Sequence, residues 1–280
     1  ELDTERREIR LPEQKLEELK ALIRLWKYKK ACKKRELLSL VGKLSHACKV
    51  VHPGRAFLRR MIDLSTKARH PDHWVKLDAE FQADLAWWET FISVWNAWSM
   101  MEVHNPKWTP TVIFSSDASG AWGCGAVWRQ AWLQHSWDEE WMPQSIAAKE
   151  LVPIAVACAV WGPEWCHQQV LVQCDNMAVV QVITAQSCKD HVLMHLLRCI
   201  HFFCARCDFK LRAEHIPGSS NTPADAVSRN HMQVFFEATP QAHRCPTPVP
   251  SPLWSFLTNR QPEWTSPAWK EWLRTSSGTA

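Results

Sequence analysis

The sequence predicts an α/β domain with a mixed five-stranded sheet flanked by helices, preceded by a small α-helical bundle. The apolar spacing is helical before residues 106–110 and becomes strand-like after them. From residue 111, three strand patterns joined by short turns are followed by alternating helices and strands, an order typical of a mixed sheet. The composition, 46% hydrophobic and 22% charged, is that of a globular protein and argues against disorder throughout.

The first hundred residues carry apolar side chains at helical spacing, as in the series from Leu16 to Trp26. His52-Pro53-Gly54 is expected to interrupt this helical region. We expect helices around residues 16–26, 34–51, 57–62 and 77–95. Together they would pack as a small bundle, which we define as a region spanning residues 1–105.

The second region, residues 106–235, contains the elements of the sheet. The runs 111–116, 121–129, 132–137, 170–174 and 209–216 predict strands, and the runs 145–161, 178–183, 191–204 and 222–228 predict helices. Pro153 falls inside the first of these helices and is expected to kink it. Residues 236–280 are rich in Pro and Ser, which predicts a linker toward a further C-terminal domain.

The distribution of charge and the cysteine content indicate which partners and which cellular compartment to expect. Residues 1–70 hold 19 Lys and Arg against 9 Asp and Glu, whereas the remaining residues hold 14 against 20. The basic part suits a polyanion such as nucleic acid, although a solvated helical surface accounts for it as well. Eleven cysteines without a secretion signal predict reduced thiols in an intracellular protein of the nucleus or cytoplasm, and no apolar run is long enough for a membrane span.

Four acidic residues lie at positions that a folded sheet could bring close together. Asp117 and Asp175 end predicted strands, Glu150 lies in an otherwise apolar helix, and Asp225 opens the last helix. Clustered carboxylates need a cation, and hard divalent ions such as Mg²⁺ prefer oxygen ligands. Two such ions about 4 Å apart can activate water and stabilise the leaving oxygen of a phosphodiester. Taken singly, Asp225 is better explained as a helix cap, and Asp117 and Asp175 as turn residues, whereas the four acids together in this order of elements favour a shared site.

Four motifs resemble those of retroelement ribonuclease H. They are Phe114–Ser119, Lys149-Glu150-Leu151, Cys174-Asp175-Asn176, and the stretch from His215-Ile216-Pro217-Gly218 to Ala224-Asp225-Ala226-Val227-Ser228-Arg229. The last motif is the most specific, and only Val227 departs mildly from its usual form. The resemblance covers about residues 111–230 and implies a ribonuclease H-like fold for them.

The preceding region is similar to the thumb that follows a reverse transcriptase palm. Its Lys34–Leu44 stretch carries that similarity, whereas Pro53–Leu58 and Trp87-Trp88 are similar to DIRS-type elements in particular. Residues 264–280 weakly resemble the segment leading into the recombinase of those elements. The Tyr-x-Asp-Asp type turn of a palm is missing from the sequence. The resemblance therefore implies a thumb, connection and ribonuclease H part of a polyprotein, with no polymerase activity expected from this chain alone.

The resemblance also implies roles for particular residues. Asp117 and Asp175 would be the central metal ligands, and Glu150 and Asp225 would complete two Mg²⁺ sites, with Mn²⁺ as a substitute. His215 would shuttle protons or help product release, unless it is simply a solvent-facing histidine at a strand end. Residues expected to contact the substrate backbone or its 2′-hydroxyl groups are Ser119 and Asn176. The expected partners are an RNA–DNA hybrid and the palm, fingers and recombinase parts of the same polyprotein.

The expected activity is metal-dependent cleavage of the RNA strand of an RNA–DNA hybrid. One alternative is an inactive or domesticated nucleic-acid-binding remnant, and another is an assembly subunit that needs a separate polymerase. A zinc site among the His and Cys residues of 191–207 is a minor alternative, because Cys is often buried as a small hydrophobic residue. Trp122, Trp128 and Trp132 could stack on bases, but packing within the fold is the stronger interpretation.

Overall fold

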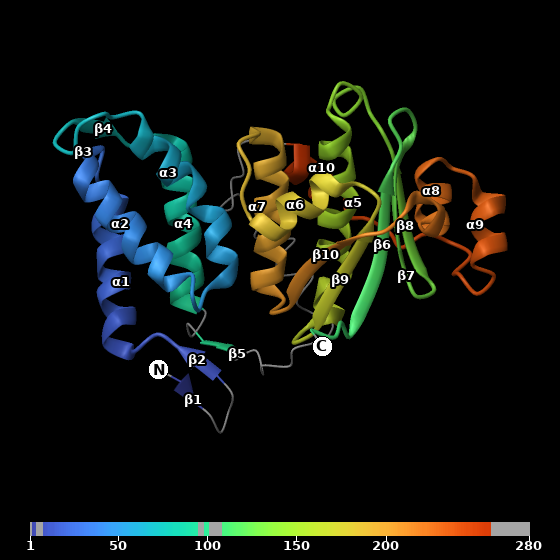
Figure 1. Ribbon diagram of the computed structural model, residues 1–280, viewed down its shortest axis with the longest axis horizontal. Coiled ribbons are helices and arrows are strands. Elements are labelled where there is room, and N and C mark those ends of the chain that lie inside the picture. Colours follow the sequence, from blue (N-terminus) through green and yellow to red (C-terminus); the bar gives the residue numbers. More distant parts are fainter. Residues whose placement is uncertain (1, 4–7, 95–97, 101–107, 259–280) are drawn as a thin grey trace. The chain divides into compact units, whose positions relative to one another are not determined.

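The computed structural model describes residues 2–3, 8–94, 98–100 and 108–258. These residues separate into two compact units, the first ending at Trp108 and the second beginning at Thr109 (Figure 1). The expected boundary between residues 105 and 106 lies close to this division. Within the described part of the chain, no helix is both long and apolar enough to span a bilayer.

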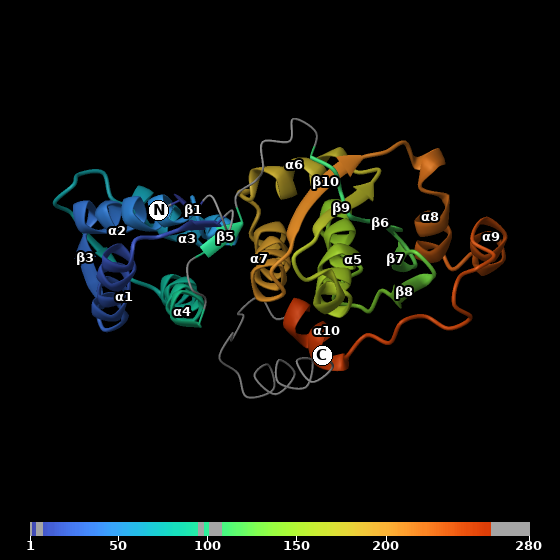
Figure 2. The same cartoon turned by 90° about the horizontal axis from the view of Figure 1, so that it is seen from below.

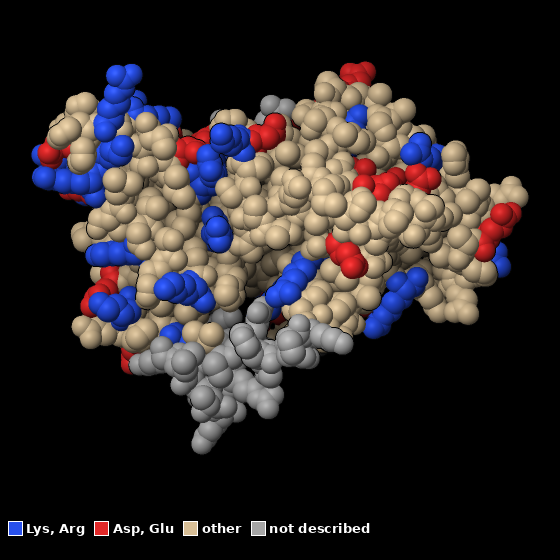
Figure 3. All heavy atoms as spheres, viewed as in Figure 1, with Lys and Arg blue, Asp and Glu red and all other residues tan. Residues whose placement is uncertain are grey.

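The first unit is mainly helical, as predicted, but it also contains five short strands that the sequence patterns did not indicate. Its helices are α1 (Glu13–Lys27), α2 (Lys34–Ala47), α3 (Arg59–Thr66) and α4 (Ala79–Val94), with a 3-10 turn at His52–Phe57. Its strands are β1 (Leu2–Asp3), β2 (Glu8–Arg10) and β5 (Trp98–Met100) in one sheet, and β3 (Ala31–Lys33) and β4 (Trp74–Lys76) in another. Lys and Arg side chains are spread over the face of this unit seen in Figure 3.

The second unit is built on a mixed five-stranded sheet in the order β10-β9-β6-β7-β8. Its strands are β6 (Val112–Ala118), β7 (Gly123–Trp128), β8 (Ala131–Ser136), β9 (Gln169–Cys174) and β10 (Lys210–His215). The first three form an antiparallel meander, whereas β9 runs parallel to both β6 and β10. The predicted mixed sheet and all five of its strands are confirmed.

Helices cover both faces of this sheet. They are α5 (Ile146–Val160), α6 (Met177–Ala185), α7 (His191–Arg206), α8 (Thr222–Ser228), α9 (Met232–Ala238) and α10 (Ser251–Thr258). Helices α5 and α7 lie on one face and α8 and α9 on the other (Figures 1 and 2). Helix α5 is buried along nearly its whole length, which explains why it is apolar all round. It continues through Pro153 as a single helix.

The segment expected to be a linker from residue 236 instead packs on the second unit as far as Thr258. The backbone N–H groups of His243 and Thr247 donate to carbonyl groups at the β8 edge, at 2.8 and 2.7 Å. Farther on, α10 buries Leu253 and Leu257, and it packs on α5 and α7. Proline content removes some N–H donors, but the remaining backbone groups and apolar side chains are enough for docking. Residues 259–280, which include the weak recombinase-like match, lie outside the described residues.

Candidate metal centre

Three of the four predicted acids converge at one end of the sheet. Asp117 is on β6, Asp175 follows β9 directly, and Glu150 lies one turn into α5. One carboxylate oxygen from each lies within 4.8 Å of those of the other two. The sheet register explains the first pair, because Ser115 is paired with Gln173 in a parallel ladder. Two residues farther along each strand, the chain brings Asp117 and Asp175 together on one face.

Glu150 is the most strongly perturbed member of the group. Burial, followed by the charges of Asp117 and Asp175, raises the pKa of its carboxyl to about 9, against a backbone hydrogen bond from Ala118 that lowers it. Its Oε2 is buried and has no hydrogen-bond partner among the described residues. A buried carboxylate oxygen without a donor is costly unless a cation meets it. The surroundings of Glu150 therefore favour a bound cation.

Asp117 lies at the centre of the group and has one strong protein partner. Burial raises the pKa of its carboxyl to about 6, and the hydrogen bond donated by the Ser228 hydroxyl opposes this change. The charges of Asp175 and Asp225 raise the pKa as well. Ser228 is on α8, so this hydrogen bond ties the last helix to the central strand. A positively charged ligand would relieve the mutual repulsion of these acids.

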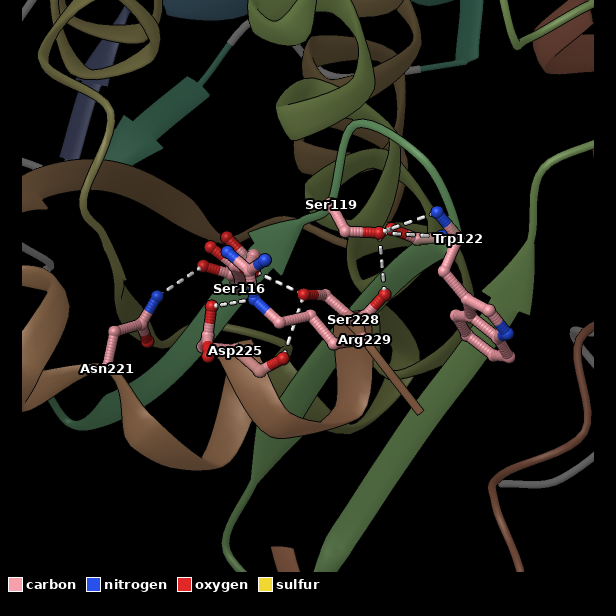
Figure 4. Close-up of polar contacts among 9 residues, drawn as sticks. Ser116, Ser119, Trp122, Asn221, Asp225, Ser228 and Arg229 are labelled. Atoms are coloured by element: carbon pink, nitrogen blue, oxygen red, sulfur yellow. Dashed lines mark hydrogen bonds and ion pairs between the residues drawn. The ribbon is translucent and has the colours of Figure 1, made fainter. Parts of the chain in front are cut away.

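Asp225, the fourth predicted acid, is close to the group but paired differently. Arg229 donates from Nε to Asp225 Oδ1 at 2.6 Å, and both side chains are about half exposed. Figure 4 shows this pair beside Ser116 and Ser228. The pKa of Arg229 is raised first by Asp225 and then also by Asp117 and Asp175. Asp225 therefore acts on the group through its charge, while its ligand role stays a prediction.

Close packing of glycines positions two of these elements. A Cβ atom on Gly125 of β7 would lie 2.3 Å from Val227 Cγ1, so α8 approaches the sheet only because residue 125 has no side chain. A Cβ atom on Gly218 would lie 3.1 Å from Asp175 Oδ2. The glycine of the His215–Gly218 motif thus leaves room for the carboxylate of Asp175.

His215 lies at the end of β10, next to the acidic group. Its Nε2 is 3.1 Å from the backbone oxygen of Asp175, and its ring is exposed. The imidazole is therefore anchored to the segment that carries a candidate ligand, rather than extended freely into solvent. This placement is compatible with both interpretations of His215 given by the sequence.

The two residues predicted to contact the substrate, Ser119 and Asn176, differ in how far other hydrogen bonds already occupy their side chains. The Ser119 hydroxyl is buried, donates toward the backbone oxygens of Gly123 and Ser228, and accepts the N–H groups of Trp122 and Gly123 (Figure 4). Ser119 thus holds the turn between β6 and β7, and a direct contact from its hydroxyl to substrate is not supported. Asn176 caps α6 through its Oδ1, which accepts from the next helix N–H groups, while its side chain stays partly exposed.

Sequence reasoning missed two residues that shape the centre, Ser228 and Arg229. Both belong to the last of the four motifs, three and four positions after Asp225, but only Asp225 was predicted to have a role. A residue three positions past Asp225 lies about one helical turn away, so the motif and its helical period could have indicated both partners. Lys149 was also missed: this buried residue donates to the backbone oxygens of Gly120 and Met142.

The group can hold a metal ion, because it offers only oxygen donors, carries excess negative charge and includes a buried oxygen without a donor. No second group of three ligating side chains occurs in the described ranges. The His and Cys residues of 191–207 therefore do not assemble a zinc site there. All eleven cysteines of the sequence fall within the described ranges, and none of them is joined in a disulfide there.

Comparison with known proteins does not assign the chain to a family. No protein-family model matches the chain, and no curated protein matches it. The interpretation of the centre therefore depends on its own geometry and chemistry.

Proposed function

We propose that this chain is a metal-dependent endonuclease that hydrolyses the RNA strand of RNA–DNA hybrids, with a ribonuclease H-like fold in its second unit. The observation that carries the proposal is the convergence of Asp117, Glu150 and Asp175, from two parallel strands and a helix, within 4.8 Å. The motif resemblance supports it independently, because the residues it marks as ligands include these three. The same resemblance suggests that the chain is part of a retroelement reverse transcriptase polyprotein.

The proposed cofactor is Mg²⁺, with two ions per active site and Mn²⁺ as a substitute. The three carboxylates, with ligand oxygens within 4.8 Å of one another, would supply the oxygen donors that Mg²⁺ prefers. Asp117 and Asp175 would be the central ligands, and Glu150 and Asp225 would complete the two sites. When bound, such ions supply a nucleophilic water at neutral pH and stabilise charge on the leaving oxygen.

The other residues around the acids would position the metal ligands and the substrate, or transfer a proton. Ser228 holds the Asp117 carboxylate in place, and Gly218 leaves the space that Asp175 needs. His215 would move a proton at the edge of the site, where an imidazole suits neutral pH. The amide nitrogen of Asn176 would donate to the hybrid, since its oxygen already caps α6. A contact there to a 2′-hydroxyl would distinguish RNA from DNA.

The direct test is cleavage of an end-labelled RNA–DNA hybrid with Mg²⁺. The wild-type chain should cut the RNA strand and leave an equivalent DNA duplex intact. Asp117→Asn removes the central negative charge at nearly constant shape and should reduce cleavage at least a hundredfold, in line with the loss of a metal ligand. Glu164→Gln, which changes an exposed acid of the same unit, is the matched control and should cut normally.

Two outcomes would overturn the proposal. If the folded wild-type chain does not cut hybrids with Mg²⁺ or Mn²⁺, the inactive remnant or the assembly subunit becomes the better interpretation. If Asp117→Asn cuts as well as the wild type, the acidic group is not the active site.

A further inference from the structure

The two-stranded sheet of the first unit presents an exposed tryptophan. Strands β3 and β4 pair antiparallel, with Lys33 opposite Trp74. Cys32 and Val75 are buried on the inner face, so the alternation of the strands places Lys33, Trp74 and Lys76 together on the outer face. Trp74 is 69% exposed there, whereas most other tryptophans of the described ranges are buried. Packing within the unit therefore leaves most of this indole open to a ligand.

The surroundings of Trp74 carry excess positive charge. The two segments that form and flank the sheet, residues 29–36 and 67–78, hold 8 Lys and Arg against 3 Asp and Glu. All three acids are in ion pairs within these segments, at 3.0 to 3.6 Å, in the pairs Asp72–Arg35, Asp72–Lys33, Glu36–Lys29 and Asp78–Lys67. Lys30, Arg69 and Lys76 are exposed and have no acidic partner in the part of the chain that the structure describes. Several Lys and Arg side chains are seen at this end of the unit in Figure 3. Such a surface favours a polyanion, which releases counterions when cations neutralise its phosphates.

A hollow of about 680 Å³ lies next to the indole. Lys67, His73 and Lys76 are part of its lining, together with Asp72 and Asp78, the two acids that are held in ion pairs. The hollow therefore places cationic side chains within reach of an exposed aromatic ring. Aromatic rings interleaved with cations are the combination that binds the bases and the backbone of a single strand.

Hydrogen bonds fix this sheet before any ligand arrives. The backbone N–H of Lys34 donates to the His73 carbonyl at 2.9 Å, and that of Leu77 donates to the Lys30 carbonyl at 2.9 Å. The ammonium group of Lys34 donates to the Ala68 carbonyl at 2.7 Å. The backbone that carries Trp74 is thus already ordered, which lowers the entropic cost of binding.

We propose that the outer face of the β3–β4 sheet binds single-stranded nucleic acid, with one base stacked on Trp74 and the neighbouring phosphates against Lys76 and the cations around it. A single strand is favoured over a duplex because its bases are free to stack on a side chain, whereas those of a duplex are already stacked on each other. It is favoured over a membrane because this face has one aromatic ring among charged groups and lacks a broad apolar side. Every base has a π-face, so little sequence preference is expected. The inference does not depend on hybrid cleavage by the second unit.

The test is equilibrium binding of an end-labelled oligouridylate to the full chain in EDTA, which suppresses metal-dependent cleavage. A length of about eight nucleotides lies within the site sizes usual for single strands. Trp74→Ala should weaken binding about tenfold, as expected for the loss of one base–aromatic stack. Trp74→Phe keeps a ring and should stay within about threefold of the wild type. A duplex of the same length should bind equally well to Trp74→Ala and wild type. Because the indole is mostly exposed, Trp74→Ala should also keep the urea midpoint of the wild type.

The salt dependence of binding separates stacking from charge. Lys76→Gln should reduce the slope of log K against log salt by about 0.7, the value for one phosphate contact on a single strand. Trp74→Ala should leave that slope unchanged. The matched control is Lys49→Gln, at an exposed position beyond the far end of α2 and about 20 Å along that helix from β3. It should keep both the affinity and the slope of the wild type.

Equal affinity of Trp74→Ala and wild type for the single strand would overturn the proposal, and so would an equal loss for single strand and duplex. Binding to vesicles of anionic phospholipid that requires Trp74, without binding to the oligouridylate, would assign the face to a membrane instead. Hybrid cleavage is measured separately. Loss of the single-strand site would therefore leave the proposed function standing, and absence of cleavage would leave this site standing.

Discussion

Replacing Glu150 by Gln should make the metal-free protein more stable at neutral and alkaline pH. Burial raises the pKa of Glu150 from its ordinary value of 4.5 to about 9. Between these pH values the folded protein holds a proton that the unfolded chain has lost. The free energy of unfolding therefore falls as the pH rises through this window, and Asp117, whose pKa is raised to about 6, acts in the same direction.

The size of the effect follows from the width of that window. At about pH 7.5 the solution is three pH units above 4.5, and each unit is worth about 1.36 kcal/mol, so Glu150 lowers stability by about 4 kcal/mol at most. Local relaxation reduces this penalty, so we expect Glu150→Gln to gain about 2–4 kcal/mol. The gain should disappear near pH 4.5, where the unfolded chain is protonated as well.

Urea unfolding across pH 5 to 9 would measure this, once with a chelator and once with saturating Mg²⁺. With Mg²⁺ the wild type should be stabilised and Glu150→Gln should respond much less, because it lacks a ligand. The matched control, Glu164→Gln, should follow the wild type throughout. A wild-type stability that does not fall with pH in chelator, or a Glu150→Gln protein less stable than wild type at pH 8, would refute the reasoning.

Three further predictions concern packing and catalysis. Gly125→Ala should lower the free energy of unfolding by about 1–3 kcal/mol, seen as a lower urea midpoint, because its methyl group would overlap Val227. On the same measurement, Leu253→Ala should lower the free energy of unfolding by about 2–5 kcal/mol, because this residue of α10 is fully buried. The control Val234→Ala, at an exposed position, should change it little. If both changes had equally small effects, residues 239–258 would behave as a linker. His215→Ala should lower kcat about a hundredfold with Mg²⁺ affinity unchanged, and normal turnover would assign His215 to the solvent-facing alternative.

The five strands of the sheet and the helices α5 to α8 were predictable from their apolar patterns, whereas α9 and α10 were not predicted. Residues 170–174 are apolar except for Gln173 and form a strand between two others, and the apolar helix 145–161 is buried along nearly its whole length. The parallel pairing of β6 with β9 then places Asp117 beside Asp175. Local patterns together with the rules of sheet topology were therefore sufficient for the core of the site.

What the sequence did not predict depends on contacts between distant segments. The composition of residues 239–258 is that of a linker, and only the edge of β8 and the faces of α5 and α7 make its docking favourable. The partner of Asp225 is an exception, because Arg229 stands only four residues farther along the chain. The strands β3 and β4 are three residues long, too short for any alternation to be recognised.

The most direct measurement is the position of Mn²⁺ in crystals of this chain, read from its anomalous scattering. The account predicts a strong peak bonded to carboxylate oxygens of Asp117, Glu150 and Asp175, lost in Asp117→Asn crystals. No peak at saturating Mn²⁺, or a peak with Glu150 turned away from it, would contradict the claim that these acids form a cation site.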